Sequence, residues 1–194
     1  MHELEIDLHC SMANKKVAVI GGGAAGFFAA LSVKEHHPNH EVLLFEKTSK
    51  VLSKVKVSGG GRCNVTHAEF IPQELVSNYP RGERELLGPF YTFMTGDTIA
   101  WFEKRGVALK IEEDGRIFPV SNSSQTIIDC FINEARTHNV EVLTNHPVIS
   151  IVYDDNNWLV NTKTDSFTCQ KLVIATGSNP KIWNLLQELG HSVS

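Results

Sequence analysis

The sequence has 194 residues, of which 42% are hydrophobic and 21% charged, a composition typical of a globular protein with one sizeable core. Its 18 basic and 22 acidic side chains give a net charge of −4, which argues against a general affinity for nucleic acid or for an anionic membrane. No apolar run approaches the roughly 20 residues that span a bilayer. The four cysteines form no C-x-x-C pair, which favours reduced thiols over a disulfide framework or a zinc site.

The first 14 residues show no link to the pattern that follows them. They are acidic and lack the positive-then-apolar order of a signal peptide. We therefore expect residues 1–14 to be a disordered tail or one added by cloning, and we expect the protein to be cytoplasmic.

A glycine-rich turn follows the first apolar run, Val17–Ile20, and opens a helical pattern that reaches about His36. In such a G-x-G-x-x-G turn, Gly21 permits the sharp turn, Gly23 lets the backbone approach a pyrophosphate, and Gly26 lets helix and strand pack closely. The helix N-terminus adds free N–H groups and a partial positive charge. The motif alone is common, so it predicts a phosphate site only if a strand precedes it and an acid ends the next strand.

That acid is Glu46, at the end of the apolar run that begins at Glu41. The unit from Val17 to Glu46 has the size of one βαβ unit. A carboxylate at the end of the second strand can accept both ribose hydroxyls of an adenosine, and it disfavours a 2′-phosphate. The sequence therefore predicts a site for FAD or NAD rather than NADP, the alternative being that Glu46 is an ordinary exposed acid.

A second glycine-rich stretch, Ser58–Thr66, lies in the segment 47–68, which contains five Lys or Arg residues and no acid. Three consecutive glycines leave backbone N–H groups unshielded, and Arg62 offers a planar cation. The stretch is a second candidate for anion binding. A flexible, solvated loop is the alternative.

The rest of the chain predicts scaffold elements in a recognisable order. They are a loop-containing connection over 70–88, a helix at 98–104, a hairpin of 107–111 with 116–120, a helix capped by Ser121 or Ser123, a parallel strand at 140–143, an antiparallel meander over 148–153, 158–162 and 166–168, an apolar strand at 171–177 and a helix at 182–189. The order predicts an α/β fold, a Rossmann-like FAD/NAD(P)-binding domain over residues 15–194 with a parallel sheet and an antiparallel β-meander.

These motifs together resemble the bacterial flavoproteins grouped as aminoacetone oxidase-like or BaiN-like NAD(P)/FAD-dependent oxidoreductases. The resemblance covers nearly all of residues 15–194, and its most specific part is the stretch Ser58–Thr66. Members of that family are considerably longer than this chain. The resemblance therefore implies an N-terminal FAD-binding half, without the substrate domain and the C-terminal segment that returns to the flavin.

The resemblance also implies FAD as the cofactor and assigns the residues that hold it. In such flavoproteins the residue matching Val148 binds the adenine through its backbone, and the Ala-Thr-Gly turn approaches the phosphates. No side chain is given a catalytic role, because the flavin carries the redox chemistry, and no metal is expected. With the motifs above, the predicted cofactor-binding residues are Gly21, Gly23, Ala24, Ala25, Gly26, Glu46, Lys47, Ser58, Gly59, Gly60, Arg62, Cys63, Asn64, Val148, Ala175, Thr176 and Gly177.

The expected partners are FAD, a small-molecule substrate and NADH or NADPH as reductant, with homo-oligomerisation left open. We expect neither a membrane nor a nucleic acid as partner. Two other hypotheses remain open. The chain could be a truncated, non-catalytic nucleotide-binding module, or a flavoprotein of RNA uridine modification. Against the latter stand the acidic balance outside 47–68 and the absence of aromatic residues interleaved with the basic ones.

Overall fold

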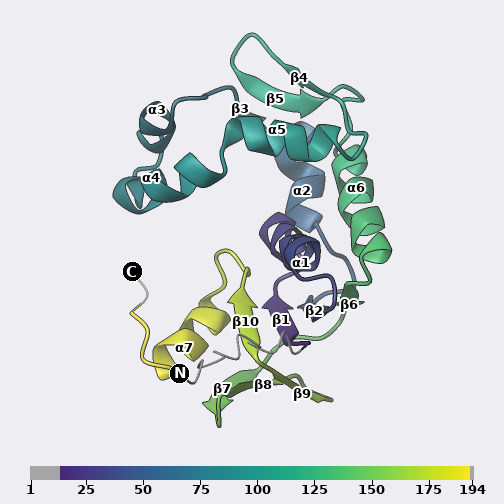
Figure 1. Cartoon of the computed structure of the whole chain (residues 1–194), viewed down its shortest axis with the longest axis vertical. Helices are drawn as coiled ribbons and strands as arrows, with labels where there is room; N and C mark the ends of the chain where they lie inside the picture. Colours follow the sequence, from purple (N-terminus) through teal and green to yellow (C-terminus); the bar gives the residue numbers. More distant parts are fainter. Residues whose placement is uncertain (1–13, 193–194) are drawn as a thin grey trace, which may run out of the picture.

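The centre of the fold is a four-stranded parallel sheet, seen in a computed structural model that describes residues 14–192 (Figure 1). Its strand order is β10 (Lys171–Ile174), β1 (Lys16–Ile20), β2 (Glu41–Phe45) and β6 (Glu141–Leu143). Four of the five residues are buried in both β1 and β2. Continuous apolar strands of this kind need cover on both faces of the sheet, and the predicted Rossmann-like domain is confirmed.

Helices lie on one side of this sheet. They are α1 (Ala24–His36), next to the strands, α2 (Ser53–Val57) and α5 (Thr95–Glu103), farther out, and α6 (Ser124–Thr137) (Figure 1). Between them and the sheet lies an apolar cluster that includes Val19, Leu31, Leu44 and Phe131. Of the two serines predicted to cap α6, Ser123 does so, because its hydroxyl accepts a hydrogen bond from the Gln125 N–H at 3.3 Å.

The largely buried cation of Arg105 connects three of these helices. The guanidinium of Arg105 lies 3.7 Å from the ring centroid of Trp101 on α5. It also forms ion pairs with Glu35 of α1 and, at 2.9 Å, with Glu134 of α6. Because the Arg105 side chain is only 10% exposed, its charge depends on these two carboxylates for compensation.

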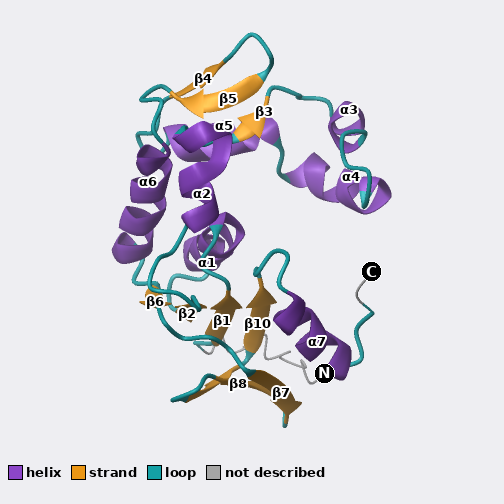
Figure 2. Cartoon of the chain, turned by 180° about the vertical axis from the view of Figure 1, so that it is seen from behind, coloured by secondary structure: helices purple, strands orange, loops and turns teal. Residues whose placement is uncertain are grey.

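The opposite face of the sheet is covered by the predicted meander and the last helix (Figure 2). The meander consists of β7 (Ser150–Asp154), β8 (Asn157–Asn161) and β9 (Ser166–Cys169), all antiparallel, and the helix is α7 (Pro180–Glu188). Alternate residues of β1 and β2 point this way, so that Ile20 and Phe45 pack with Val160 and Ile182. The period of two in the central strands thus separates two apolar clusters.

Farther from the sheet, the 3₁₀ turn η1 (Ser58–Gly61) leads into a small antiparallel sheet of β3 (Thr66–His67), β5 (Arg116–Pro119) and β4 (Leu109–Ile111). The expectation of a loop-containing connection over 70–88 was incomplete, because the segment folds as α3 (Pro72–Val76) and the first part of α4 (Glu83–Thr92). The predicted turn signal around Pro80 lies between the two helices. Gly82, with a φ of +83°, directly precedes α4.

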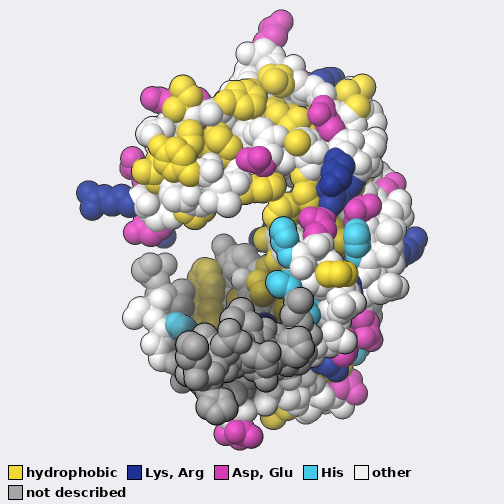
Figure 3. Space-filling model, in the orientation of Figure 1, with side chains coloured by type: hydrophobic (Ala, Val, Ile, Leu, Met, Phe, Trp, Pro, Cys, Tyr) yellow, Lys and Arg dark blue, Asp and Glu magenta, His cyan; other side chains and the backbone are white. Residues whose placement is uncertain are grey.

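The segment around α3 and α4 presents apolar side chains to the solvent. Phe70, Ile71 and Tyr91 are 50–64% exposed, and α4 buries none of its residues. Figure 3 shows the hydrophobic surface gathered over this part of the molecule. No helix within residues 14–192 is long and apolar enough to cross a membrane. The predicted tail, apart from Asn14, lies outside the described residues.

Two glycine substitutions test whether the packing between β1 and α1 requires a residue without a side chain. A Cβ atom on Gly26 would lie 1.8 Å from the carbonyl oxygen of Gly21, so Gly26→Ala must displace the backbone and should lower the free energy of unfolding by about 3 kcal/mol or more. A Cβ atom on Gly96 of α5 meets nothing within 4 Å, so Gly96→Ala should raise it by about 0.5–1 kcal/mol. Urea unfolding of both variants measures the difference, and equal stabilities would contradict the packing described here.

Candidate cofactor-binding site

The three glycines of the predicted phosphate turn have different roles in the structure. Gly21, with a φ of +118°, would bring a Cβ atom to 2.4 Å from the Ala175 carbonyl oxygen, and Gly26 packs against Gly21 itself. Gly23 is different, because its backbone is extended, with φ −92° and ψ −175°, and a Cβ atom there would meet nothing within 4 Å. Neither conformation nor packing within the protein requires glycine at position 23. The open space beside it fits a ligand that approaches the backbone.

The same turn exposes the N-terminus of α1. Gly23 precedes the helix without a side-chain cap, and the first turn of α1 contains no acidic residue. The N–H groups that begin a helix lack partners within it and carry a partial positive charge. Such a terminus beside open space is suited to bind an anionic group.

The predicted ribose acceptor, Glu46, is held in a fixed position at the end of β2. Its Oε2 accepts a hydrogen bond from the Gly22 N–H at 3.1 Å, and its Oε1 accepts from the backbone N–H and the hydroxyl of Thr48, each at 2.9 Å. Gly22 has to be small here, because a Cβ atom would lie 2.9 Å from the Glu46 Cβ. A carboxylate has about four acceptor positions, so Glu46 retains capacity for a further donor.

A groove of about 820 Å³ runs past the turn and Glu46. It lies at the carboxyl ends of β1, β2 and β10, where ligands bind in open α/β sheets. The groove brings together ten of the predicted residues: Gly21, Gly23, Ala24, Ala25, Glu46, Lys47, Val148, Ala175, Thr176 and Gly177. It is also lined by residues that the sequence analysis did not assign, among them Gly22, Lys50, Lys54, His146 and Lys181.

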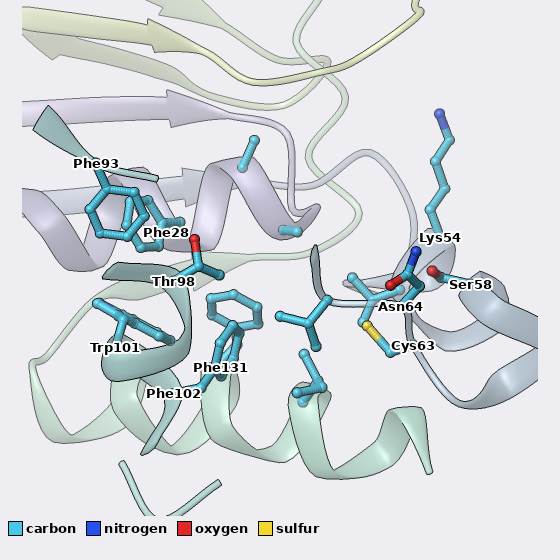
Figure 4. Close-up of a pocket in the computed structure, with 15 residues that line it drawn as sticks. Phe28, Lys54, Ser58, Cys63, Asn64, Phe93, Thr98, Trp101, Phe102 and Phe131 are labelled. Carbon is cyan, nitrogen blue, oxygen red and sulfur yellow. The ribbon is translucent and has the colours of Figure 1, made fainter. Parts of the chain in front are cut away.

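A second, apolar cavity of about 450 Å³ adjoins the groove. Figure 4 shows its aromatic residues at one end, with Thr98 among them, and its other polar residues, nearest α2, at the other. The aromatic end is formed by Phe28, Phe93, Trp101, Phe102 and Phe131, and the polar end by Lys54, Ser58, Cys63 and Asn64. Three predicted residues of the second glycine-rich stretch, Ser58, Cys63 and Asn64, therefore line this cavity rather than the groove.

Cys63 adopts a backbone conformation that is unusual for its residue type. Its φ is +64°, in the left-handed region, and its side chain is buried. Burial raises the pKa of the thiol, and a hydrogen bond with Ser58 opposes that effect only in part. The thiol is therefore protonated near neutral pH, which argues against a nucleophilic thiolate at this position.

The remaining predicted residues of this stretch, Gly59, Gly60 and Arg62, line neither cavity. The Arg62 guanidinium pairs with Glu112 at 2.6 Å and lies 3.9 Å from the ring centroid of Phe118. Gly59 packs tightly, since a Cβ atom there would lie 2.7 Å from Phe118, whereas Gly60 faces open space. A role for these three residues in cofactor binding stays a prediction.

Curated relatives match most of this chain but less than half of their own length. It is 32% identical over 159 residues to the ribosomal RNA dihydrouridine synthase of Escherichia coli K12, covering 82% of the chain and 38% of that protein. It is 23% identical over 187 residues to the 3-dehydro-bile acid delta(4,6)-reductase of Clostridium scindens, covering 92% of the chain and 45% of that protein.

Solved structures share the fold at low sequence identity. The structure of THI4 from Thermovibrio ammonificans has a TM-score of 0.60 at 14% identity, with 92% of this chain and 64% of that one covered. The structure of CtdE in complex with FAD and substrate 4 has a TM-score of 0.51 at 15% identity, with 88% and 40% covered. The family model of the HI0933-like protein Rossmann domain matches residues 15–194, and the chain belongs to that family.

Proposed function

We propose that this chain is the FAD-binding part of a flavin-dependent oxidoreductase. The observation that carries the proposal is the open space at Gly23, between the uncapped N-terminus of α1 and the anchored carboxylate of Glu46. An anion site and a ribose acceptor on one groove are what the diphosphate and the adenosine of a dinucleotide require. Support also comes from CtdE, which shares the fold and was solved with FAD.

The residues divide the binding of FAD among them. The N–H groups at the start of α1 and the open backbone at Gly23 would hold the diphosphate, and Glu46 would accept a hydrogen bond from the ribose. The backbone of Val148 would bind the adenine. The polar end of the apolar cavity, with Ser58 and Asn64, would face the flavin end of the cofactor. When bound, FAD supplies two-electron redox chemistry, while the protein orients its ring and limits access of water.

The reaction that we propose for the whole protein is reduction of an organic substrate, with NADH or NADPH as the source of electrons. A reductase and a dihydrouridine synthase are among the relatives, and each name describes a reduced product or a reduction. A second candidate is reduction of uridine in RNA. It is favoured by the relative with 32% identity, the ribosomal RNA dihydrouridine synthase of Escherichia coli K12.

Gly23→Val tests the cradle for the diphosphate. Valine adopts extended backbone readily but is a poorer N-cap than glycine, so the variant should fold with a melting temperature lowered by only a few degrees while its side chain fills the open space. We expect the absorbance of bound flavin, present in the reconstituted wild-type chain, to be lost. Gly96→Val, also in open space but on α5, is the matched control and should retain flavin. Retention of flavin by Gly23→Val would contradict the proposal.

Glu46→Ala tests the ribose acceptor. Hydrogen bonds to a charged group contribute about 1.5–3 kcal/mol, so the affinity for FAD should fall by about tenfold or more. The control is Glu41→Ala, which removes an exposed carboxylate at the far end of β2, paired with Lys16. Fluorescence titration with FAD measures both variants. An affinity unchanged by Glu46→Ala would show that another group binds the ribose.

The second candidate is tested in cells rather than with the isolated chain. Disruption of the gene should remove dihydrouridine from ribosomal RNA, as measured by mass spectrometry of nucleosides, and a plasmid copy should restore it. Dihydrouridine that persists after disruption would exclude this candidate and leave the reduction of a small molecule.

A further inference from the structure

The groove and the apolar cavity meet at the N-terminus of α1. Four residues line both of them: Ala24, Ala25, Lys54 and Val55. Ala24 and Ala25 form the first turn of α1, whose N–H groups make this terminus an anion site. Lys54 is the only one of the four with a polar side chain. A single ammonium group therefore stands at the junction where an anion on α1 would lie.

The Lys54 side chain extends across the groove. It comes from α2 on one wall, and Figure 4 shows it pointing away from the aromatic end of the apolar cavity. On the other wall, a Cβ atom placed on Gly177 would lie 3.7 Å from the Lys54 Nζ. Gly177 belongs to the turn between β10 and α7 that was predicted to approach the phosphates. The ammonium thus lies beside the predicted phosphate turn, on the groove that the start of α1 also lines.

The charge of Lys54 has no partner in the protein as far as residues 14–192 describe it. None of the ion pairs or side-chain hydrogen bonds among these residues includes its Nζ, whereas Lys16, Lys34 and Lys110 all have partners. The one carboxylate on the groove, Glu46, is held at its own end by Thr48 and Gly22. An ammonium without a partner on a groove can be compensated by an anionic ligand.

We infer that Lys54 binds the diphosphate of the nucleotide cofactor and is a specificity-determining residue for ligands that carry phosphate at this junction. The inference rests on the proposed function for the identity of FAD, but not for the anion itself. ADP contains the same diphosphate and adenosine without a flavin. Lys54 should therefore contribute to the binding of FAD and ADP alike, and not to the binding of adenosine.

The test compares Lys54→Met with Lys56→Met by calorimetric titration with ADP, adenosine and FAD. Lys56 lies two residues away on the same helix, is exposed and lines neither cavity, so the control removes an equal charge. We expect Lys54→Met to weaken ADP and FAD at least tenfold, equivalent to about 1.4 kcal/mol, and to leave adenosine unchanged. Lys56→Met should stay within about threefold for all three ligands, allowing for a weak long-range charge effect.

Two further measurements sharpen the result. Added salt should weaken ADP binding more steeply for the wild-type chain than for Lys54→Met, and Lys54→Arg should restore most of the affinity. An ADP affinity unchanged by Lys54→Met, or an equal loss for ADP and adenosine, would overturn the inference. A wild-type chain that binds ADP through Lys54 but does not bind FAD would instead contradict the proposed function and leave the inference in place.

Discussion

The fold depends on close backbone-to-backbone packing between glycines at the turn between β1 and α1. Gly26 packs its backbone against the carbonyl oxygen of Gly21, and Gly21 in turn packs against Ala175 at the end of β10. Hydrogen bonds of 2.8 Å join Gly21 to Phe45 of β2 and Ala175 to Ile20 of β1. Three strands and one helix therefore converge where no Cβ atom could fit. The N-terminus of α1, at the carboxyl end of β1, has no side-chain cap and lines the groove.

The groove beside this turn contains two kinds of charged group, the carboxylate of Glu46 and several lysines. The carboxylate of Glu46 is immobilised by Gly22 and Thr48 before any ligand arrives, so little ordering would be needed when a ribose binds. The lysines of the groove are exposed, and they are suited to a phosphate, which accepts hydrogen bonds from an ammonium from many directions. The cavity next to the groove is lined mainly by apolar side chains, with aromatic rings at the end away from α2.

Much of the fold was predictable because its signals are local. The βαβ unit and the meander show in periods of 3.6 and two residues, and both are confirmed. Helix α4 was not predicted, because Gly88 and Pro89 inside it are residues that usually interrupt a helix, and it buries none of its residues. Helix α2 is only five residues long, too short for a periodic pattern. Only the structure shows this helix, in which Val55 packs into the apolar cluster that includes Leu31 and Leu44.

By itself, the sequence determined the order of strand, turn and helix, the acid at the end of β2 and the exclusion of several classes of protein, because each follows from residue type and spacing. The tertiary structure alone decided that Gly23 is open while Gly21 and Gly26 are packed. It also turned Arg62 toward Glu112, 50 residues away, and set Lys54 where the two cavities meet. These facts depend on contacts between residues far apart in the chain, which local periodicity does not encode.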